Sequence, residues 1–183
     1  MQKKKKLSVK LKMKRVGNIA IVIFVAAVVI LSVFFPVLRI YGSSMSPTLA
    51  DGDIAVAVKI SSISIGDILV FEHNGKTLIR RCIAQSGDWV NIDTNGNVFV
   101  NNEKITEPYI YRKSIGECDI SFPYQVPENS FFVMGDNRGI AVDSRLREIG
   151  CVSKDDLKGK LLFRLLPIGK FSLNENRELN YEA

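Results

Sequence analysis

The chain has 183 residues, 46% hydrophobic and 24% charged, which is typical of a folded protein and excludes a disordered or collagen-like chain. Its net charge of +6 comes from one end, since residues 1–15 hold eight Lys and Arg residues and no acid. The other 168 residues hold 17 basic and 19 acidic residues, about −2. A nucleic-acid-binding domain would keep its basic excess on the folded part, so this charge distribution argues against one. Three cysteines are too few for a disulfide scaffold.

An uncharged, apolar run of 23 residues, 16–38, follows the basic tail. As a helix it would be about 35 Å long, enough to cross a hydrocarbon core of about 30 Å. A cleaved signal peptide is the alternative, but its apolar region is usually only about 7–15 residues long. The nearest pair of small residues, Gly42 and Ser44, also lies well past the run. We therefore expect a single transmembrane anchor over residues 16–38.

The charge asymmetry around this run predicts the orientation of the protein. Eight basic residues precede the run and only Arg39 follows it closely, so the positive-inside rule places residues 1–15 in the cytoplasm. Residues 39–183 should then form an extracytoplasmic domain at the cell membrane. The basic tail either binds anionic lipid headgroups or only sets the topology, and the sequence leaves both open.

The outer domain has the pattern of an all-β protein. Apolar alternation and turn residues predict strands at residues 53–60, 67–72, 76–84, Trp89–Ile92, 97–100, Ser130–Met134 and 160–166. Asn74-Gly75 between the second and third of these is a strong hairpin signal. We expect an antiparallel β-sandwich or partly closed barrel, with residues 103–125 as an extended insertion of little regular pattern.

Three motifs carry candidate chemistry: GSSMSPTL at residues 42–49, LIRRCIAQSGD at 78–88 and MGDNRGIAVDSR at 134–145. Each alone is compatible with turns and ion pairs. In this order behind an anchor, and with the GDILVF strand, they resemble type I signal peptidases over nearly the whole chain. The resemblance implies an all-β catalytic domain that cleaves signal peptides from exported preproteins with a Ser–Lys dyad. It implies no metal and no other cofactor.

The resemblance assigns roles to individual residues. It implies that Ser44 is the nucleophile and that the Ser44 backbone N–H belongs to the oxyanion hole. It implies that Met45 and Pro47 shape the turn and that Met45, Pro47 and Cys82 contact the substrate. Cys82 also fits a small buried or half-buried strand residue. It gives three residues a supporting role around the base: Arg81, Asp143 and Arg145.

Two positions depart from the family pattern. The family's general base is a lysine 36 residues after the nucleophile, and here that position is Arg80. A lysine can lose its proton near neutral pH when it is buried, whereas arginine stays charged and has no lone pair to accept one. The serine hydroxyl that orients the family's lysine is replaced by Ala141.

No other residue is an evident substitute base. Some relatives use histidine at the base position, and the only histidine here is His73. If His73 pairs with Lys76 across the hairpin, Arg80 lies four residues further along the strand, roughly 14 Å away. We therefore expect His73 and Lys76 to be solvated turn residues.

The sequence leaves two functions open. The first is an active membrane-bound serine endopeptidase that cleaves preprotein signal peptides. The second is a catalytically impaired relative that binds signal-peptide-like or pilin-like segments and assists secretion or surface assembly. A soluble self-cleaving repressor-type peptidase also uses a Ser–Lys pair, but the apolar span disfavours it. The expected partners are signal peptides and membrane lipid, not nucleic acid. Whether Cys118 and Cys151 form a disulfide also stays open.

Overall fold

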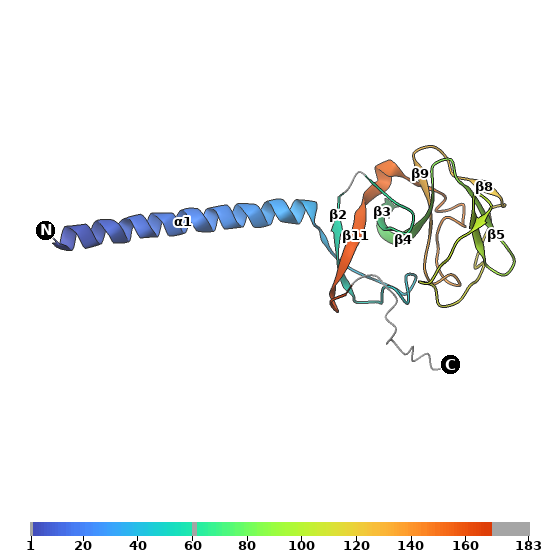
Figure 1. Ribbon diagram of the computed structural model, residues 1–183, viewed down its shortest axis with the longest axis horizontal. Helices are drawn as coiled ribbons and strands as arrows, with labels where there is room; N and C mark the ends of the chain where they lie inside the picture. The colour runs from blue at the N-terminus through green and yellow to red at the C-terminus, as the bar shows by residue number, and fades with distance from the viewer. Residues whose placement is uncertain (1, 60–61, 170–183) are drawn as a thin grey trace. The chain divides into compact units, whose positions relative to one another are not determined.

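A computed structural model of the protein describes residues 2–59 and 62–169. The chain divides into two units, Met1–Pro36 and Val37–Ala183. The first unit is one helix, α1 (Gln2–Phe34), whose segment Val16–Phe34 is long and apolar enough to cross a membrane (Figure 1). The helix ends four residues before the predicted limit of the span, because Pro36 cannot continue it and Leu38 already belongs to the first strand.

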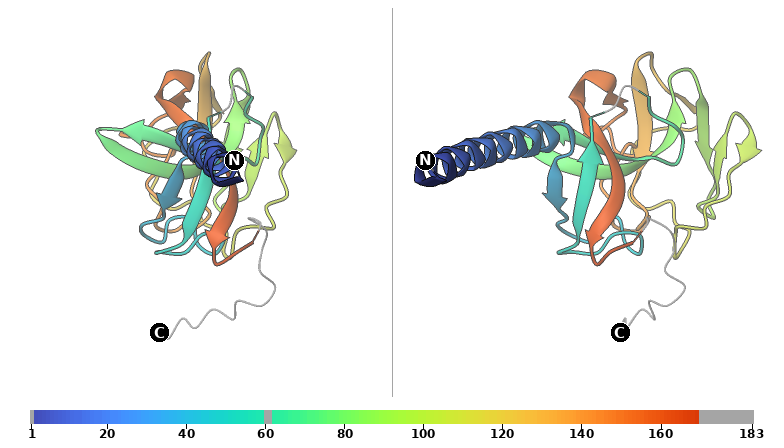
Figure 2. Two further views of the ribbon diagram at one scale, coloured as in Figure 1. Left: turned by 90° about the vertical axis from the view of Figure 1, so that its left-hand side faces the viewer. Right: turned by 60° about the vertical axis from the view of Figure 1, so that its left-hand side comes forward.

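The second unit is mostly antiparallel β-sheet, which confirms the predicted fold class. Its larger sheet has seven strands in the order β1-β2-β11-β3-β4-β9-β10. Their bounds are β1 Val37–Arg39, β2 Ile54–Val58, β3 Ile68–His73, β4 Lys76–Gln85, β9 Ser130–Met134, β10 Val152–Ser153 and β11 Leu157–Leu166. Figure 2 shows the strong twist of this sheet in two further views.

A smaller sheet of four strands, in the order β7-β6-β5-β8, completes the domain. Its strands are β5 Trp89–Ile92, β6 Val98–Val100, β7 Glu103–Lys104 and β8 Tyr124–Gln125, and a short 3₁₀ helix, η1 (Lys154–Asp156), precedes β11. The predicted insertion thus contains only β7 and β8 at its two ends. Between them the chain follows an irregular path over the outside of the domain.

The β3–β4 hairpin sets the position of Arg80. Asn74 and Gly75 both have positive φ, as a two-residue hairpin turn requires, and His73 pairs with Lys76 as the sequence predicts. This register places Arg80 opposite Leu69. β4 pairs with β9 only from Arg81 onward, so its first five residues leave one edge without a strand partner in the described sheet.

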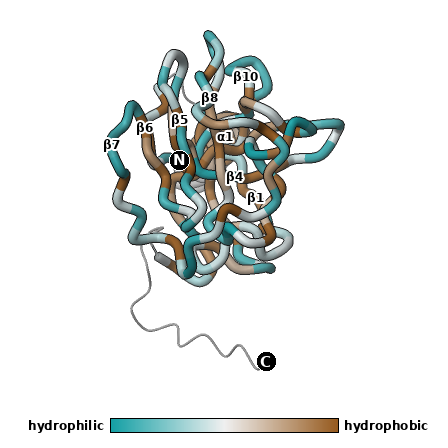
Figure 3. Tube along the Cα trace, turned by 90° about the vertical axis from the view of Figure 1, so that its right-hand side faces the viewer, coloured by the Kyte–Doolittle hydropathy of each residue, from teal (hydrophilic) through white to brown (hydrophobic). Residues whose placement is uncertain are grey.

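Apolar side chains form three buried clusters in the β domain. One lies under the smaller sheet and includes Ile83, Val90 and Phe132. A second contains Met45 and Leu49 and supports the turn that carries Ser44. The third contains Cys82 beside Leu69, Phe71 and Val133. In Figure 3 the apolar segments follow the strands, and the polar ones gather in the connecting loops.

Candidate active site

Ser44 lies in the turn between β1 and β2. Met45, the next residue, is 2% exposed and Leu49 is fully buried, so their side chains hold this turn against the core while Ser44 stays half-buried. The carbonyl of Ser44 accepts a hydrogen bond from the backbone N–H of Asn137 (3.0 Å). Within the described residues the Ser44 backbone N–H has no hydrogen-bond partner. A donor in an oxyanion hole must be free in this way to bind the substrate oxygen.

Arg80 reaches Ser44 directly. Its Nη1 donates to Ser44 Oγ at 2.8 Å and to the Ile79 carbonyl at 2.6 Å. Its Nε and Nη2 both donate to the carbonyl of Val142, at 2.9 and 2.7 Å. The guanidinium is therefore held in one orientation beside the serine hydroxyl, and the whole residue is only 6% exposed.

The charge state of Arg80 decides what this pair can do. Burial lowers the pKa of Arg80, the nearby carboxylate of Asp143 raises it, and the charge of Arg145 lowers it again. The net direction is downward, but a guanidinium starts from a pKa above 12 and stays protonated in proteins. Arg80 is consequently a hydrogen-bond donor to Ser44 and has no free lone pair for the serine proton.

Ala141 lies directly beside the Ser44 turn. A Cβ on Gly135 would sit 2.3 Å from Ala141 Cβ and 2.6 Å from the Ser44 carbonyl oxygen, so only glycine fits at residue 135. Ala141 has no hydroxyl to offer Arg80. The carbonyl of the next residue, Val142, makes the two hydrogen bonds that orient the guanidinium instead.

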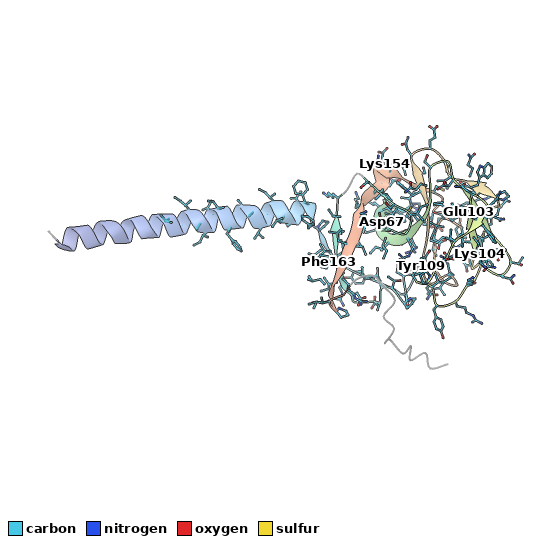
Figure 4. The ribbon with its side chains drawn as sticks, viewed as in Figure 1. Asp67, Glu103, Lys104, Tyr109, Lys154 and Phe163 are labelled. Atoms are coloured by element: carbon cyan, nitrogen blue, oxygen red, sulfur yellow. The ribbon has the colours of Figure 1, made fainter. Side chains whose placement is uncertain are left out.

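Arg81 points away from Arg80 and forms a buried ion pair. Its Nε and Nη2 donate to the carboxylate of Asp136 at 2.8 and 2.6 Å. Thr48, in the Ser44 turn, donates to the same carboxylate. The guanidinium carbon of Arg81 lies 3.9 Å from the ring centroid of Tyr109, which is labelled in Figure 4. Arg81 thus ties the Ser44 turn, the loop after β9 and the insertion together.

Asp143 and Arg145 form a second buried pair, with both side chains fully buried. Arg145 Nε and Nη2 donate to the two oxygens of Asp143, each at 2.8 Å. Asp143 also accepts the backbone N–H of Gly135 at 2.9 Å. This pair fixes the loop that supplies Val142 to Arg80, and its supporting role in catalysis stays a prediction.

A groove of about 460 Å³ opens beside Ser44. Its walls are residues 37–42 from β1 and the following turn, Ser44 and Met45, and residues 77–80 of β4. Pro47 is half-buried and does not line the groove. Cys82 does not line it either, since it packs in the core beside Leu69 and Phe71 at 0% exposure. The prediction that Cys82 contacts substrate is therefore corrected.

A family model described as signal peptidase, peptidase S26, matches residues 13–166. The chain belongs to this family. It is 33% identical over 177 residues to signal peptidase I U of Bacillus subtilis (strain 168), covering 90% of this chain and 94% of that relative. It is 33% identical over 159 residues to signal peptidase IB of Staphylococcus aureus (strain MRSA252), covering 76% and 82%.

A solved structure of a signal peptidase I from Enterococcus faecalis V583 aligns with 57% of this chain and all of its own chain, at 24% identity and a TM-score of 0.48.

The structure adds residues of this signal peptidase family member that the motifs did not single out. Glu107 forms a buried ion pair with Arg138, and the carbonyl of Ile115 accepts from Arg145 at 2.7 Å. With Tyr109 against Arg81, three points of the insertion are thus fixed by arginines of the sequence motifs. No sequence signal indicated these contacts, because the insertion shows no regular pattern.

The remaining candidates lie apart from Ser44. His73 sits at the hairpin tip, where its Nε2 is 3.0 Å from Asn74 Nδ2. Cys118 and Cys151 are both free thiols and half-buried. Within residues 2–59 and 62–169, no three His, Cys, Asp or Glu side chains are arranged to hold a metal.

Proposed function

We propose that this signal peptidase family member binds the signal-peptide segments of exported preproteins beside Ser44, and that Arg80 impairs its cleavage of them. The hydrogen bond from Arg80 Nη1 to Ser44 Oγ carries the proposal. Ser44 is the nucleophile position and Arg80 the general-base position, and a serine that accepts from a permanent cation has no base there to remove its proton.

Two strand edges support the proposed binding mode. The outer edge of β1 and the edge of Lys76–Arg80 both lack a strand partner in the described sheets, and both border the groove. An extended peptide can pair with such edges through main-chain hydrogen bonds. Its scissile carbonyl then lies beside the Ser44 backbone N–H, which has no partner among residues 2–59 and 62–169.

The character of the groove supports small apolar side chains before the scissile bond. Apolar residues, among them Leu38, Ile40, Met45 and Ile79, make up much of its lining, together with the charged Arg39 and Arg80. Alternate side chains of an extended peptide point to the same wall. We propose that this wall selects small residues at alternate positions.

The proposed location is the outer face of the cell membrane. The basic segment 1–15 is assigned to the cytoplasm, Val16–Phe34 to the membrane and the β domain to the outside. The β domain also exposes apolar side chains along β11, including Phe163 and Leu166, and on Ile168 beyond it. Such a surface suits contact with lipid, where an emerging signal peptide is presented.

Slow hydrolysis by Ser44 is the second candidate function. The fixed guanidinium stabilises negative charge on Ser44 Oγ. Hydroxide from solvent can therefore remove the proton of the Ser44 hydroxyl in place of a protein base. Hydrolysis through this route should be far slower than in a relative with a lysine, because general-base help contributes a factor of about 10²–10⁴.

The experiment that tests both is binding and cleavage of one preprotein by purified full-length protein, with Ser44→Ala as the control. We expect photo-crosslinks from the signal peptide to residues 37–42 and 77–80, together with little or no cleavage. Crosslinks confined to residues 105–120 would contradict the binding mode. Rapid cleavage that Ser44→Ala abolishes would show that a different group serves as the base.

A further inference from the structure

A second pocket lies next to the Ser44 turn, and the proposed function does not use it. Its volume is about 430 Å³. One wall is formed by Ser46, Asn137 and Gly139, and the other by residues 111–114 of the insertion, with Asp136 at the border. Ser46 is only two residues after Ser44, so the pocket and the groove are lined by neighbouring residues of one short turn.

Asn137 connects the pocket wall to the candidate nucleophile. Its backbone N–H donates to the Ser44 carbonyl at 3.0 Å and its side-chain amide to the Ser43 carbonyl at 3.3 Å. A polypeptide whose scissile bond lies at Ser44 has its apolar segment before the bond in the groove. In that binding mode the segment after the bond lies within reach of this pocket, because both adjoin the same turn.

The pocket carries uncompensated positive charge. Arg112 and Lys113 are both exposed, and within the described part of the chain neither has a carboxylate at ion-pair distance. Lys113 Nζ donates instead to the side-chain oxygen of Asn97 at 2.7 Å. The one acid at the border, Asp136, is already paired with Arg81.

The basic wall is anchored on both sides. Before it, Glu107 is paired with the buried Arg138, and after it, the Ile115 carbonyl accepts from the buried Arg145. Gly116 packs so closely that a Cβ there would lie 2.3 Å from the Arg138 carbonyl oxygen. Arg112 and Lys113 are thus presented from a short segment fixed at each end to the loop after β9. A preformed wall costs less ordering entropy when a ligand binds.

We propose that this pocket binds the polypeptide segment that follows the scissile bond, and that Arg112 and Lys113 select acidic side chains in it. The inference rests on the proposed function, in which an extended preprotein segment passes Ser44. Acidic residues shortly after the bond pair with these two cations, and basic residues there are repelled.

The test compares two fluorescent peptides that share an apolar segment and small residues before the bond. One carries three Asp residues after the bond and the other three Asn residues. Binding to the full chain with Ser44→Ala, in detergent micelles, is measured by anisotropy so that no peptide is cleaved. The same titrations are run with Arg112→Gln/Lys113→Gln added. A charge-matched control carries Lys154→Gln/Lys158→Gln, and Lys154 is drawn well apart from Tyr109 in Figure 4.

We expect the Asp peptide to bind about three- to tenfold more tightly than the Asn peptide, from two partly exposed ion pairs. The preference should shrink as salt is raised. It should vanish in Arg112→Gln/Lys113→Gln and persist in the control. Equal binding of the two peptides overturns the pocket's role but leaves the proposed function standing. Loss of the preference in the control also overturns it, because net charge would then explain the effect. No binding of either peptide overturns the proposed function, and this inference with it.

Discussion

The guanidinium of Arg80 donates a hydrogen bond to the hydroxyl oxygen of Ser44, 36 residues away, across 2.8 Å. Two further hydrogen bonds to the Val142 carbonyl prevent the guanidinium from turning aside. In the proposed function, the position that would hold the proton acceptor for Ser44 thus holds a fixed hydrogen-bond donor.

Replacing Arg80 by lysine should increase cleavage. Arg80→Lys restores an amine that can lose its proton, and Ala141→Ser adds a hydroxyl to orient it. We expect Arg80→Lys to raise the initial rate of preprotein cleavage, and Arg80→Lys/Ala141→Ser to raise it by up to about 10²–10⁴ over wild type. The two changes should be non-additive, because the second acts through the first.

The controls for this rescue are two single variants. Ala141→Ser alone should leave the rate at the wild-type level, and Ser44→Ala should abolish cleavage in every background. If the wild type cleaves as fast as the double variant, the impairment assigned to Arg80 is wrong.

The pH dependence should separate the wild type from Arg80→Lys. Only a neutral amine accepts a proton, so the activity of Arg80→Lys should rise as pH rises through the pKa of the new lysine. The burial that lowers the pKa of Arg80 should bring that lysine below its ordinary value of about 10.4. Rate profiles from pH 6 to 10 should show this rise in the variant. The same rise in the wild type would mean that another group acts as the base.

The buried pair of Asp143 and Arg145 should matter more for stability than an exposed pair. Asp143→Ala leaves the fully buried Arg145 without its counter-ion and should lower the free energy of unfolding by about 3–5 kcal/mol. Lys158→Ala removes an ion pair with Glu72 in which both side chains are about half exposed, and should cost at most about 1 kcal/mol. Denaturant unfolding of the full chain in detergent measures both. Equal losses of unfolding free energy in the two variants would contradict a larger contribution from the buried pair.

Protease added outside intact cells should digest the β domain and spare the basic tail. The reason is the positive charge before the apolar helix, which favours a cytoplasmic N-terminus. Immunoblots with tags at each end follow the two parts, and digestion after lysis is the control. A β domain that stays protected from protease until lysis would contradict the proposed topology.

The three cysteines should differ in reactivity. Burial raises the pKa of Cys82 to about 12, and Cys82 is 0% exposed, so its reactive thiolate is nearly absent at pH 8. Burial also raises the pKa of Cys151, to about 11. Iodoacetamide followed by peptide mass spectrometry should find Cys82 unmodified in the folded protein and modified in denaturant. Modification of Cys82 at the denatured rate would contradict its core position, and a Cys118–Cys151 disulfide would appear as a linked peptide.

The sequence by itself determined the parts of this protein that depend on local pattern. An apolar run of helical length, alternating strands and the Asn74-Gly75 turn come from residues close together in the chain, and the structure confirms them. The inability of residue 80 to accept a proton also follows from the residue type alone, because a guanidinium stays protonated in proteins and has no free lone pair.

Tertiary structure alone decided which distant groups meet. Arg80 takes its orientation from a carbonyl 62 residues away, and Glu107 and Ile115 hold arginines about 30 residues on, although the insertion shows no regular period. The substrate contact assigned to Cys82 was wrong for the same reason, because being on the same strand as Arg80 does not make it accessible, whereas the alternative of a small buried strand residue is confirmed. β4 is covered on both faces there, and that covering comes from β3, β9 and the loops, whose approach depends on strand register and sheet curvature rather than on any local pattern.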